Sequence, residues 1–502
     1  MHDGTFPSPP PPIREIRDRK LNLVLKSNAP MSLGVNLYRR HDDTVTAHVL
    51  SNGSSAICIL CYPVGAGRGH RTAGNGTIFG RGGTVGHIRN GGGVYGRLQK
   101  RLDRFPIGAP PASALYEILK RLYTEEEAEI AARMPIRFTD LAGIARRVKK
   151  SPEDLRPILH RMADKGLVMD FEHQGELMYI LSPTVIGFFE FAFMRVRTDL
   201  PQKEIARHMV AYAHDEPDFA RAVFSGKVQA GRALVHEDAT DPADLTRILD
   251  HERATHIVRN AKAWAVSLCY CRHIREHEGK ACGKPMEVCT TLNSAADYVV
   301  RHGLGRRIPM EEALDIFART RAEGLVHIGD NVKRRPAYVC HCCGCCCAML
   351  SAVNRFKMFD AVVTSPFEAA FDPARCNGCG LCAKKCPVSA IRIEGEGREK
   401  RASLSPGICL GCGVCKPACA RDALSMAPRG ERIMVPETAW QRAVIMAIER
   451  GKFQNLLFDD FDRLDHAVLR AVTRIVVALP PVKKTLLSQR VQSRFFRALA
   501  GR

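Results

Sequence analysis

The sequence predicts an α+β protein composed of several domains. Its 502 residues suffice for two to four domains, and a hydrophobic content of 45% is ordinary for a chain that folds around buried cores. Helical spacing of apolar residues dominates residues 112–165, 184–335 and 434–502, whereas strand patterns are short and local. Eighteen of the 20 cysteines fall between Cys269 and Cys419. These patterns divide the chain after residues 105, 183, 366 and 428.

The first segment, residues 1–105, is predicted to be a disordered basic arm. It holds a proline run from Pro9 to Pro12 and 13 glycines between Gly65 and Gly96. Glycine loses more backbone entropy on ordering than any other residue, so such a stretch does not order unaided. The arm has 15 lysines and arginines against 6 acidic residues, a charge of +9 within a net +21. This charge suits nucleic acid, an anionic membrane or an acidic protein without choosing among them.

Residues 106–183 show three helical patterns followed by two strand patterns. Helices are predicted at 125–134, 138–149 and 151–165. The third begins with Ser151 as N-cap and Pro152 at the first helical position, and Gly166 is placed to end it. The segments 167–171 and 178–181 then read as a hairpin around Gln174 and Gly175. Three helices followed by a hairpin resemble a winged helix.

Residues 184–366 and 429–502 are both predicted to be mainly helical. The stretch from Lys483 to Arg502 has six basic residues and no acid, with apolar residues recurring four apart. We therefore expect a helical basic tail that suits an anionic membrane surface. The longest apolar run, residues 184–194, is too short to cross a bilayer and contains Glu190, so no transmembrane segment is expected.

The crowding of cysteines indicates metal ligation. Residues 1–30 lack the basic, apolar and small-residue regions of a signal peptide, which predicts a reducing, cytoplasmic setting. Closely spaced cysteines in such a setting are metal ligands more often than disulfide partners.

Two cysteine patterns repeat at an offset of 33 residues, and Pro373 and Pro406 repeat with them. Each pattern is C-x2-C-x2-C-x3-C, the spacing that wraps three cysteines around one cubane and sends the fourth to a neighbouring cluster. The duplication resembles a bacterial-type ferredoxin with two [4Fe-4S] clusters and covers about 60 residues, here assigned to 367–428. One ligand set is then Cys376, Cys379, Cys382 and Cys419, and the other is Cys409, Cys412, Cys415 and Cys386.

Ten further cysteines precede this module. Four of them lie within 21 residues, and a chain extended from Ala265 to Cys271 would turn the first two to the same side. Four thiolates match a cubane or a tetrahedral zinc ion, and unliganded structural cysteines are the alternative. These four are Cys269, Cys271, Cys282 and Cys289.

The other six cysteines occur within eight residues, a density that no apolar core requires. Gly344 permits a turn that would bring both arms of this run onto one cluster, and labile disulfides are the alternative. All ten upstream cysteines together could form two four-thiolate sites with two left over, or one unusual site. The six are Cys340, Cys342, Cys343, Cys345, Cys346 and Cys347.

From about Tyr95 onward the chain resembles a poorly characterised family of bacterial multi-cluster ferredoxin-like proteins. The features that carry this resemblance are C-x-C-R, C-x2-P-x3-C and the cysteine-rich run ahead of the duplicated pattern. The resemblance implies electron transfer.

The leading functional prediction is therefore an iron-sulfur electron-transfer protein with two [4Fe-4S] clusters and a further iron-sulfur or zinc centre. The alternatives are a redox-sensing regulator and an oxidoreductase subunit that uses the upstream cysteines. Gly91, Gly93 and Gly96 match G-x-G-x-x-G formally, but no apolar strand precedes them, and no P-loop or flavin motif supports nicotinamide or ATP chemistry within the chain. Electrons must then come from a redox partner such as a flavoprotein or dehydrogenase. DNA is not expected as a partner, because the third helix has no net charge and begins with two acids, Glu153 and Asp154.

Overall fold

The structure is a computed structural model that describes residues 93–241, 244, 248–431, 433–460 and 462–488, together with the backbone of four N-terminal strands. The chain forms two compact units, residues 1–85 and 86–502. In the first unit the strands form an antiparallel sheet in the order β1-β2-β3-β4. Sequence patterns singled out no strand here, and the predicted disorder of residues 1–105 otherwise falls largely outside the described residues. The strands are β1 (Asn22–Leu25), β2 (Leu33–Arg39), β3 (Thr44–Ser51) and β4 (Ala56–Pro63).

The described part of the second unit begins with helix α1 (Gly93–Leu102), which lies within residues 1–105, so the prediction that this whole segment is a disordered arm was wrong for these residues. Leu98 and Leu102 are buried in the main core. Arg101 is buried as well and donates a hydrogen bond to the carbonyl of Asp459. These contacts come from residues far away in the chain, which is why the glycine-rich local sequence did not reveal this helix.

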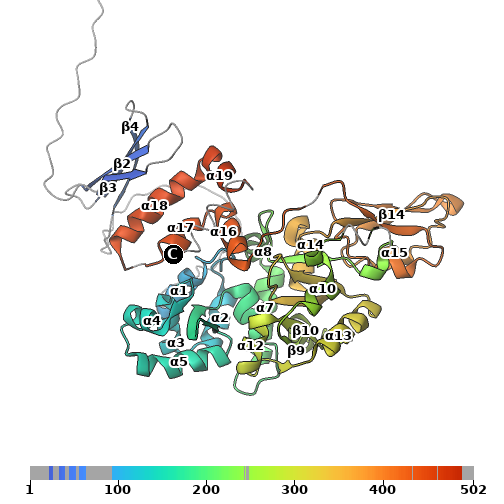
Figure 1. The fold of residues 1–502 in the computed structure, drawn as a ribbon, viewed down its shortest axis with the longest axis horizontal. Coiled ribbons are helices and arrows are strands. Elements are labelled where there is room, and N and C mark those ends of the chain that lie inside the picture. Colours follow the sequence, from blue (N-terminus) through green and yellow to red (C-terminus); the bar gives the residue numbers. More distant parts are fainter. Residues whose placement is uncertain are drawn as a thin grey trace, which may run out of the picture. The chain divides into compact units, whose positions relative to one another are not determined.

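The three helices and the hairpin expected within residues 106–183 are present (Figure 1). Ser151 accepts a hydrogen bond from the Asp154 amide and caps α5, while Gly166 ends that helix at a φ of +78°. A short strand, β5, completes an antiparallel sheet in the order β5-β7-β6. The elements are α2 (Ser113–Leu122), α3 (Glu125–Arg133), β5 (Thr139–Asp140), α4 (Leu141–Val148), α5 (Pro152–Asp164), β6 (Val168–His173) and β7 (Glu176–Leu181).

A six-stranded antiparallel sheet forms the centre of residues 184–366, where the sequence predicted helices and no sheet. The strand order is β11-β9-β10-β13-β12-β8, and α13 packs beside β9 and β10 (Figure 1). The strands are β8 (Gly231–Leu234), β9 (Trp264–Leu268), β10 (Glu287–Leu292), β11 (Arg306–Arg307), β12 (Val326–Asp330) and β13 (Tyr338–Cys342).

The sheet escaped detection because polar residues occupy its interior. All five residues of β12 are buried, including His327 and Asp330, so polar side chains in this strand do not mark a solvent-facing side. His341 of β13 is 1% exposed and shares hydrogen bonds with the hydroxyls of Thr290 and Thr320. Buried polar groups are tolerated when they are paired in this way, and such pairing cannot be read from one strand alone.

Residues 184–366 also contain eight α-helices whose bounds the structure describes, so the predicted helical character of this segment was correct in part. They are α6 (Phe189–Phe191), α7 (Gln202–Val210), α8 (Pro217–Phe224), α10 (Ala254–Arg259), α11 (Tyr270–His277), α12 (Asn293–Arg301), α13 (Met310–Ala322) and α14 (Ala348–Phe356).

Residues 367–428 contain two small antiparallel strand pairs. The pair of β14 (Phe367–Phe371) with β17 (Leu424–Pro428) and the pair of β15 (Ile391–Glu394) with β16 (Arg401–Leu404) hold the segments that carry the two cysteine repeats. One short helix, α15 (Leu381–Lys385), leads to the fourth cysteine of the first repeat.

The C-terminal segment is helical as far as the structure describes it. Asp459 lies between two of its helices and bonds Arg101 and Arg147 of the N-terminal helices. No helix within the described residues is long and apolar enough to cross a membrane. Residues 489–502, which hold most of the predicted basic tail, lie outside the described part. The helices are α16 (Ala439–Glu449), α17 (Phe453–Leu457), α18 (Leu464–Ala478) and α19 (Pro480–Leu486).

Candidate metal centres

The second cysteine repeat lines a small buried cavity together with the fourth cysteine of the first repeat. Cys386, Cys409, Cys412 and Cys415 all face this cavity, which Ile391 of β15 and Met426 of β17 help to close. The grouping matches the crossed ligand set expected from the sequence. Burial raises the pKa of Cys412 to about 12, so a bound cluster would have to displace the proton from this thiol.

The first repeat is nearer the surface. Cys379 is exposed and Cys376 is half-buried, whereas Cys382 is buried. Burial raises the pKa of Cys382, and the nearby Cys379 and Cys376 sulfurs add to this effect. Cys419 follows the turn of residues 416–418, which contacts α15. The two repeats therefore differ in solvent access although their sequences match.

Backbone amides point at the sulfurs of both fourth cysteines in the same way. The Ala390 amide donates to Cys386 Sγ at 3.2 Å, and the Ala423 amide donates to Cys419 Sγ at 3.3 Å. Each donor lies four residues after its cysteine, so the two sequence repeats share this hydrogen bond as well as their cysteine spacing. Such N-H groups favour the thiolate and tune the potential of a cluster.

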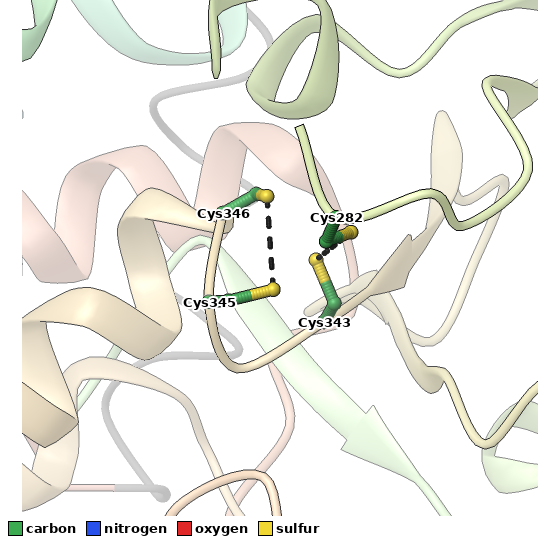
Figure 2. A group of neighbouring side chains, drawn as sticks. All are labelled: Cys282, Cys343, Cys345 and Cys346. Atoms are coloured by element: carbon green, nitrogen blue, oxygen red, sulfur yellow. Dashed lines mark hydrogen bonds between the residues drawn. The ribbon is translucent and has the colours of Figure 1, made fainter. Parts of the chain in front are cut away.

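The ten upstream cysteines divide into two groups. Cys343, Cys345 and Cys346 belong to the turn between β13 and α14, and their sulfurs lie within 4.8 Å of one another and of Cys282 (Figure 2). We call these four residues the outer cysteine group. The Gly344 turn brings Cys343 together with Cys345 and Cys346, whereas the other three cysteines of the run lie at a second site, so the run of six does not supply one site. Sequence adjacency could not show this, because Cys282 lies 61 residues before Cys343.

The other six upstream cysteines line one small cavity beside the sheet, and we call these six the inner cysteine group. Cys343 of the outer group also borders this cavity. Strands β10 and β13 are neighbours, which places Cys289 beside Cys340, and Cys342 shares a face with Cys340 because side chains alternate along a strand. The Cys342 and Cys347 sulfurs are 3.4 Å apart. The group consists of Cys269, Cys271, Cys289, Cys340, Cys342 and Cys347.

The geometry at Cys269 and Cys271 differs from the extended segment considered in the sequence. Strand β9 ends at Leu268, Cys269 caps helix α11, and Cys271 lies in its first turn. Both residues still line the inner cavity. The start of helix α11 brings both side chains to the cavity, and the alternation of side chains along an extended strand plays no part.

Arg272 lies against the sulfurs of both groups. Its side chain is buried, and Nη1 donates to the His341 carbonyl at 3.0 Å and contacts Cys343 Sγ at 3.9 Å. Its Nε and Nη2 atoms are buried without a hydrogen-bond partner in the described part of the chain. Burial lowers the pKa of Arg272, but the Cys269 and Cys343 sulfurs outweigh this effect and raise it. A buried cation whose nearest anions are thiolates fits a negatively charged metal-thiolate centre.

Hydrogen bonds between neighbouring cysteines lower the pKa of one thiol in each group. A hydrogen bond with Cys289 helps to lower the pKa of Cys340 to about 5, and a hydrogen bond with Cys346 does the same for Cys343. The thiolate is the form that binds metal. All eighteen cysteines described with side chains are free thiols, so none is consumed in a disulfide.

An apolar cavity of about 140 Å³ adjoins the inner cysteine group. Its lining includes Cys289 and Cys340 and one carboxylate, Glu190. Glu190 accepts a hydrogen bond from the Gly187 amide at 3.0 Å, and its burial raises its pKa to about 7. The sequence did not identify Glu190 as a site residue. The signal that could have done so is an acid inside an otherwise apolar run.

The ferredoxin repeat and the upstream turn are in direct contact. The Asn354 side-chain amide donates to the carbonyls of Gly344 and Pro387 at 3.3 and 3.0 Å. A Cβ on Gly344 would lie 2.5 Å from the Pro387 carbonyl oxygen, so only glycine allows this approach. In space, the outer cysteine group and Cys386 are therefore linked by the contact between Gly344 and Pro387, which are the chain neighbours of Cys343 and Cys386.

One further cluster of possible ligand atoms is explained by ion pairing. His302 bonds Asp164 at 2.7 Å and Asp170 at 3.1 Å, and His160 lies beside them. Both ring nitrogens of His302 are bonded to carboxylates, so these residues join the end of α12 to α5 and β6.

A 4Fe-4S dicluster domain model matches residues 375–423. The match covers both cysteine repeats and coincides with the paired cavity and amide geometry described above. No curated protein and no solved structure matches the chain. The fold and the site thus define the class of this protein, which is an iron-sulfur protein with a 4Fe-4S dicluster domain. The clustered upstream cysteines add a group that could bind a further metal.

Proposed function

We propose that this protein transfers electrons through two [4Fe-4S] clusters and at least one centre formed by the upstream cysteines. The first cluster is held by Cys376, Cys379, Cys382 and Cys419, and the second by Cys409, Cys412, Cys415 and Cys386. The observation that carries the proposal is the contact between Pro387, which follows ligand Cys386, and Gly344 of the upstream cysteine turn. Cys342 and Cys347 of the inner cysteine group flank this turn, so an electron on the second cluster would be close to the inner group.

The difference in burial gives the transfer a direction through the module. The first cluster would be reached from solvent through exposed Cys379. Three of the four cysteines of the second cluster are only 7–8% exposed, and the fourth, Cys386, is half-buried. The Cys412 carbonyl accepts a hydrogen bond from the His236 amide, and His236 Nε2 contacts the Leu325 carbonyl at 3.0 Å. Leu325 packs with Cys343 and Cys346, and Cys343 also lines the cavity of the inner cysteine group. Electrons would enter at the first cluster, pass to the second and continue inward.

The entry surface suits an acidic redox partner, such as a flavoprotein or dehydrogenase. Exposed basic residues surround the first repeat, among them Arg375, Lys384 and Lys385. Complementary charge speeds the encounter of two proteins at low salt. The rate of reduction should therefore fall as ionic strength rises.

The experiment is an anaerobic redox titration followed by electron paramagnetic resonance. Wild-type protein should show signals from two clusters and from a third centre, with iron and acid-labile sulfide present. The double variant Cys289→Ala and Cys340→Ala should lose the third signal alone. The proposal would be wrong if the protein contains iron but shows no signal that changes within the reduction potentials known for ferredoxin clusters.

We also propose that residues 106–183 are a winged-helix domain that docks protein and does not read DNA. The order of elements from α3 to β7 supports the fold, and the turn at Ser151 to Asp154 of α5 carries two acids and no base. This domain is tied to α12 by Arg301 and His302, which both bond Asp170. A domain fixed to the cysteine-bearing sheet is suited to orienting a redox partner.

A second candidate function, reduction of a bound substrate, is favoured by the apolar cavity. It adjoins Cys289 and Cys340, and its volume of about 140 Å³ is close to that of an engineered cavity that binds benzene. An apolar molecule held there would touch the inner cysteine group, and its electrons would come from the same partner through the clusters.

Ligand binding distinguishes this candidate from simple electron transfer. Benzene should raise the thermal midpoint of wild-type protein, and Ala295→Leu, which fills the cavity, should abolish the rise. Ser294→Leu on the exposed side of the same helix is the matched control. Equal responses from all three proteins would remove support for a substrate site.

A further inference from the structure

The outer cysteine group has the shape of a single tetrahedral site. Figure 2 shows Cys282 facing Cys343 and Cys345 facing Cys346 across a small space. The sulfurs of each pair are 3.7 Å apart, and all four lie within 4.8 Å of one another. Cys282 comes from the loop between α11 and β10, and the other three come from the turn before α14. Two separate segments thus converge on one point.

The distances distinguish one ion from a cluster. A tetrahedral zinc ion with Zn-S bonds of about 2.3 Å places its sulfurs about 3.8 Å apart. In a cubane each cysteine binds a different iron at a separate corner, so the sulfurs stand much farther apart. The eight ferredoxin cysteines provide an internal comparison. No three of their sulfurs lie within 4.8 Å of one another, although the structure describes all eight.

The surroundings also fit a closed structural site. Cys346 and Cys343 are buried and Cys345 is exposed, so the site lies at the edge of the fold with four protein ligands and no open position. Structural zinc sites have this complete set of ligands, whereas catalytic sites keep a place for water. Arg272 Nη1 beside Cys343 offsets the excess negative charge of four thiolates around a divalent ion.

We propose that Cys282, Cys343, Cys345 and Cys346 bind one zinc ion, separate from the iron-sulfur centres. The ion joins the loop before β10 to the turn before α14. Through Gly344 it holds this turn against Pro387 and so positions the segment that carries Cys386. The six cysteines of the inner group then remain for the redox centre. This inference refines the additional centre of the proposed function, but it does not require electron transfer.

The test is metal analysis of full-length protein purified without oxygen. Wild-type protein should contain one zinc per chain, and absorption at the zinc edge should show four sulfurs at about 2.3 Å and no neighbouring metal. Cys282→Ala and the exposed Cys345→Ala should each lose most of this zinc. Cys271→Ala, in the inner group, should keep it. The electron paramagnetic resonance of the ferredoxin clusters reports whether each variant is folded.

Two results would overturn the inference. One is wild-type protein without zinc, or with zinc that both variants retain while the ferredoxin signals persist. The other is loss of iron and acid-labile sulfide in Cys282→Ala, which would place an iron-sulfur cluster at the outer group. Neither result depends on whether the protein transfers electrons, so failure of the zinc site and failure of the proposed function can be told apart.

Discussion

Replacement of Cys386 by alanine should selectively damage the cluster of the second repeat, although Cys386 belongs to the first. Cys386 shares its cavity with Cys409, Cys412 and Cys415 and accepts a hydrogen bond from the Ala390 amide. Removing one of four ligands should cost most of that cluster. The dicluster module should then lose about half of its iron and sulfide, because each of the two cubanes holds the same amount.

The surviving cluster can be identified by its solvent access. In Cys386→Ala it is the first cluster, whose ligand Cys379 is exposed, so ferricyanide should oxidise it rapidly. Cys419→Ala is the matched control, because its sulfur accepts the equivalent amide hydrogen bond from Ala423. That variant should keep the buried second cluster, which should react more slowly. A slowly reacting cluster in Cys386→Ala, with the exposed one lost, would refute the crossed assignment.

Three further predictions concern the scaffold. Asp459→Asn should destabilise the protein by about 3 kcal/mol, because it removes the negative charge beside buried Arg101 and half-buried Arg147. The midpoint of urea unfolding should therefore fall, and an unchanged midpoint would contradict this. His302→Gln should cost about 2 kcal/mol near pH 6, since the charged hydrogen bonds to Asp170 and Asp164 are lost. Burial lowers the pKa of His302, but those carboxylates raise it overall, and Arg301, His160 and Tyr298 also face the ring. The stabilisation should be complete below about pH 6.5 and should decline as pH rises through the raised pKa, so a difference that grows with pH would argue against this pairing. Finally, residues 106–183 should show no sequence-selective submicromolar binding to DNA from the promoter region of the protein's own gene, measured by fluorescence anisotropy at physiological salt. Binding of that kind would instead favour a redox-sensing regulator.

Local signals allowed the helices and hairpin of residues 106–183 to be predicted. Ser151 caps α5 and Gly166 ends it, and Gln174 and Gly175 form the hairpin turn with positive φ angles of 54° and 83°. Each of these features depends on residues within a few positions of one another. The sequence therefore contains all the information needed to find them.

The central sheet and the division of the upstream cysteines depend on long-range contacts. His341 is buried in β13 because Thr290 and Thr320 bond its ring, and neither is a sequence neighbour. Cys282 joins Cys343 only after the chain folds, whereas the ferredoxin ligands follow a short and specific spacing. Spacing thus predicted the dicluster module, but it could not assign the ten remaining thiols.

The most direct test of the central claim is Mössbauer spectroscopy of iron-enriched protein purified without oxygen, combined with counts of iron and acid-labile sulfide. The account predicts two [4Fe-4S] clusters in the module and additional iron that disappears in the variant with Cys289→Ala and Cys340→Ala. Iron confined to the module, with wild-type and variant spectra identical, would contradict the claim that electrons pass from the ferredoxin clusters to an upstream centre.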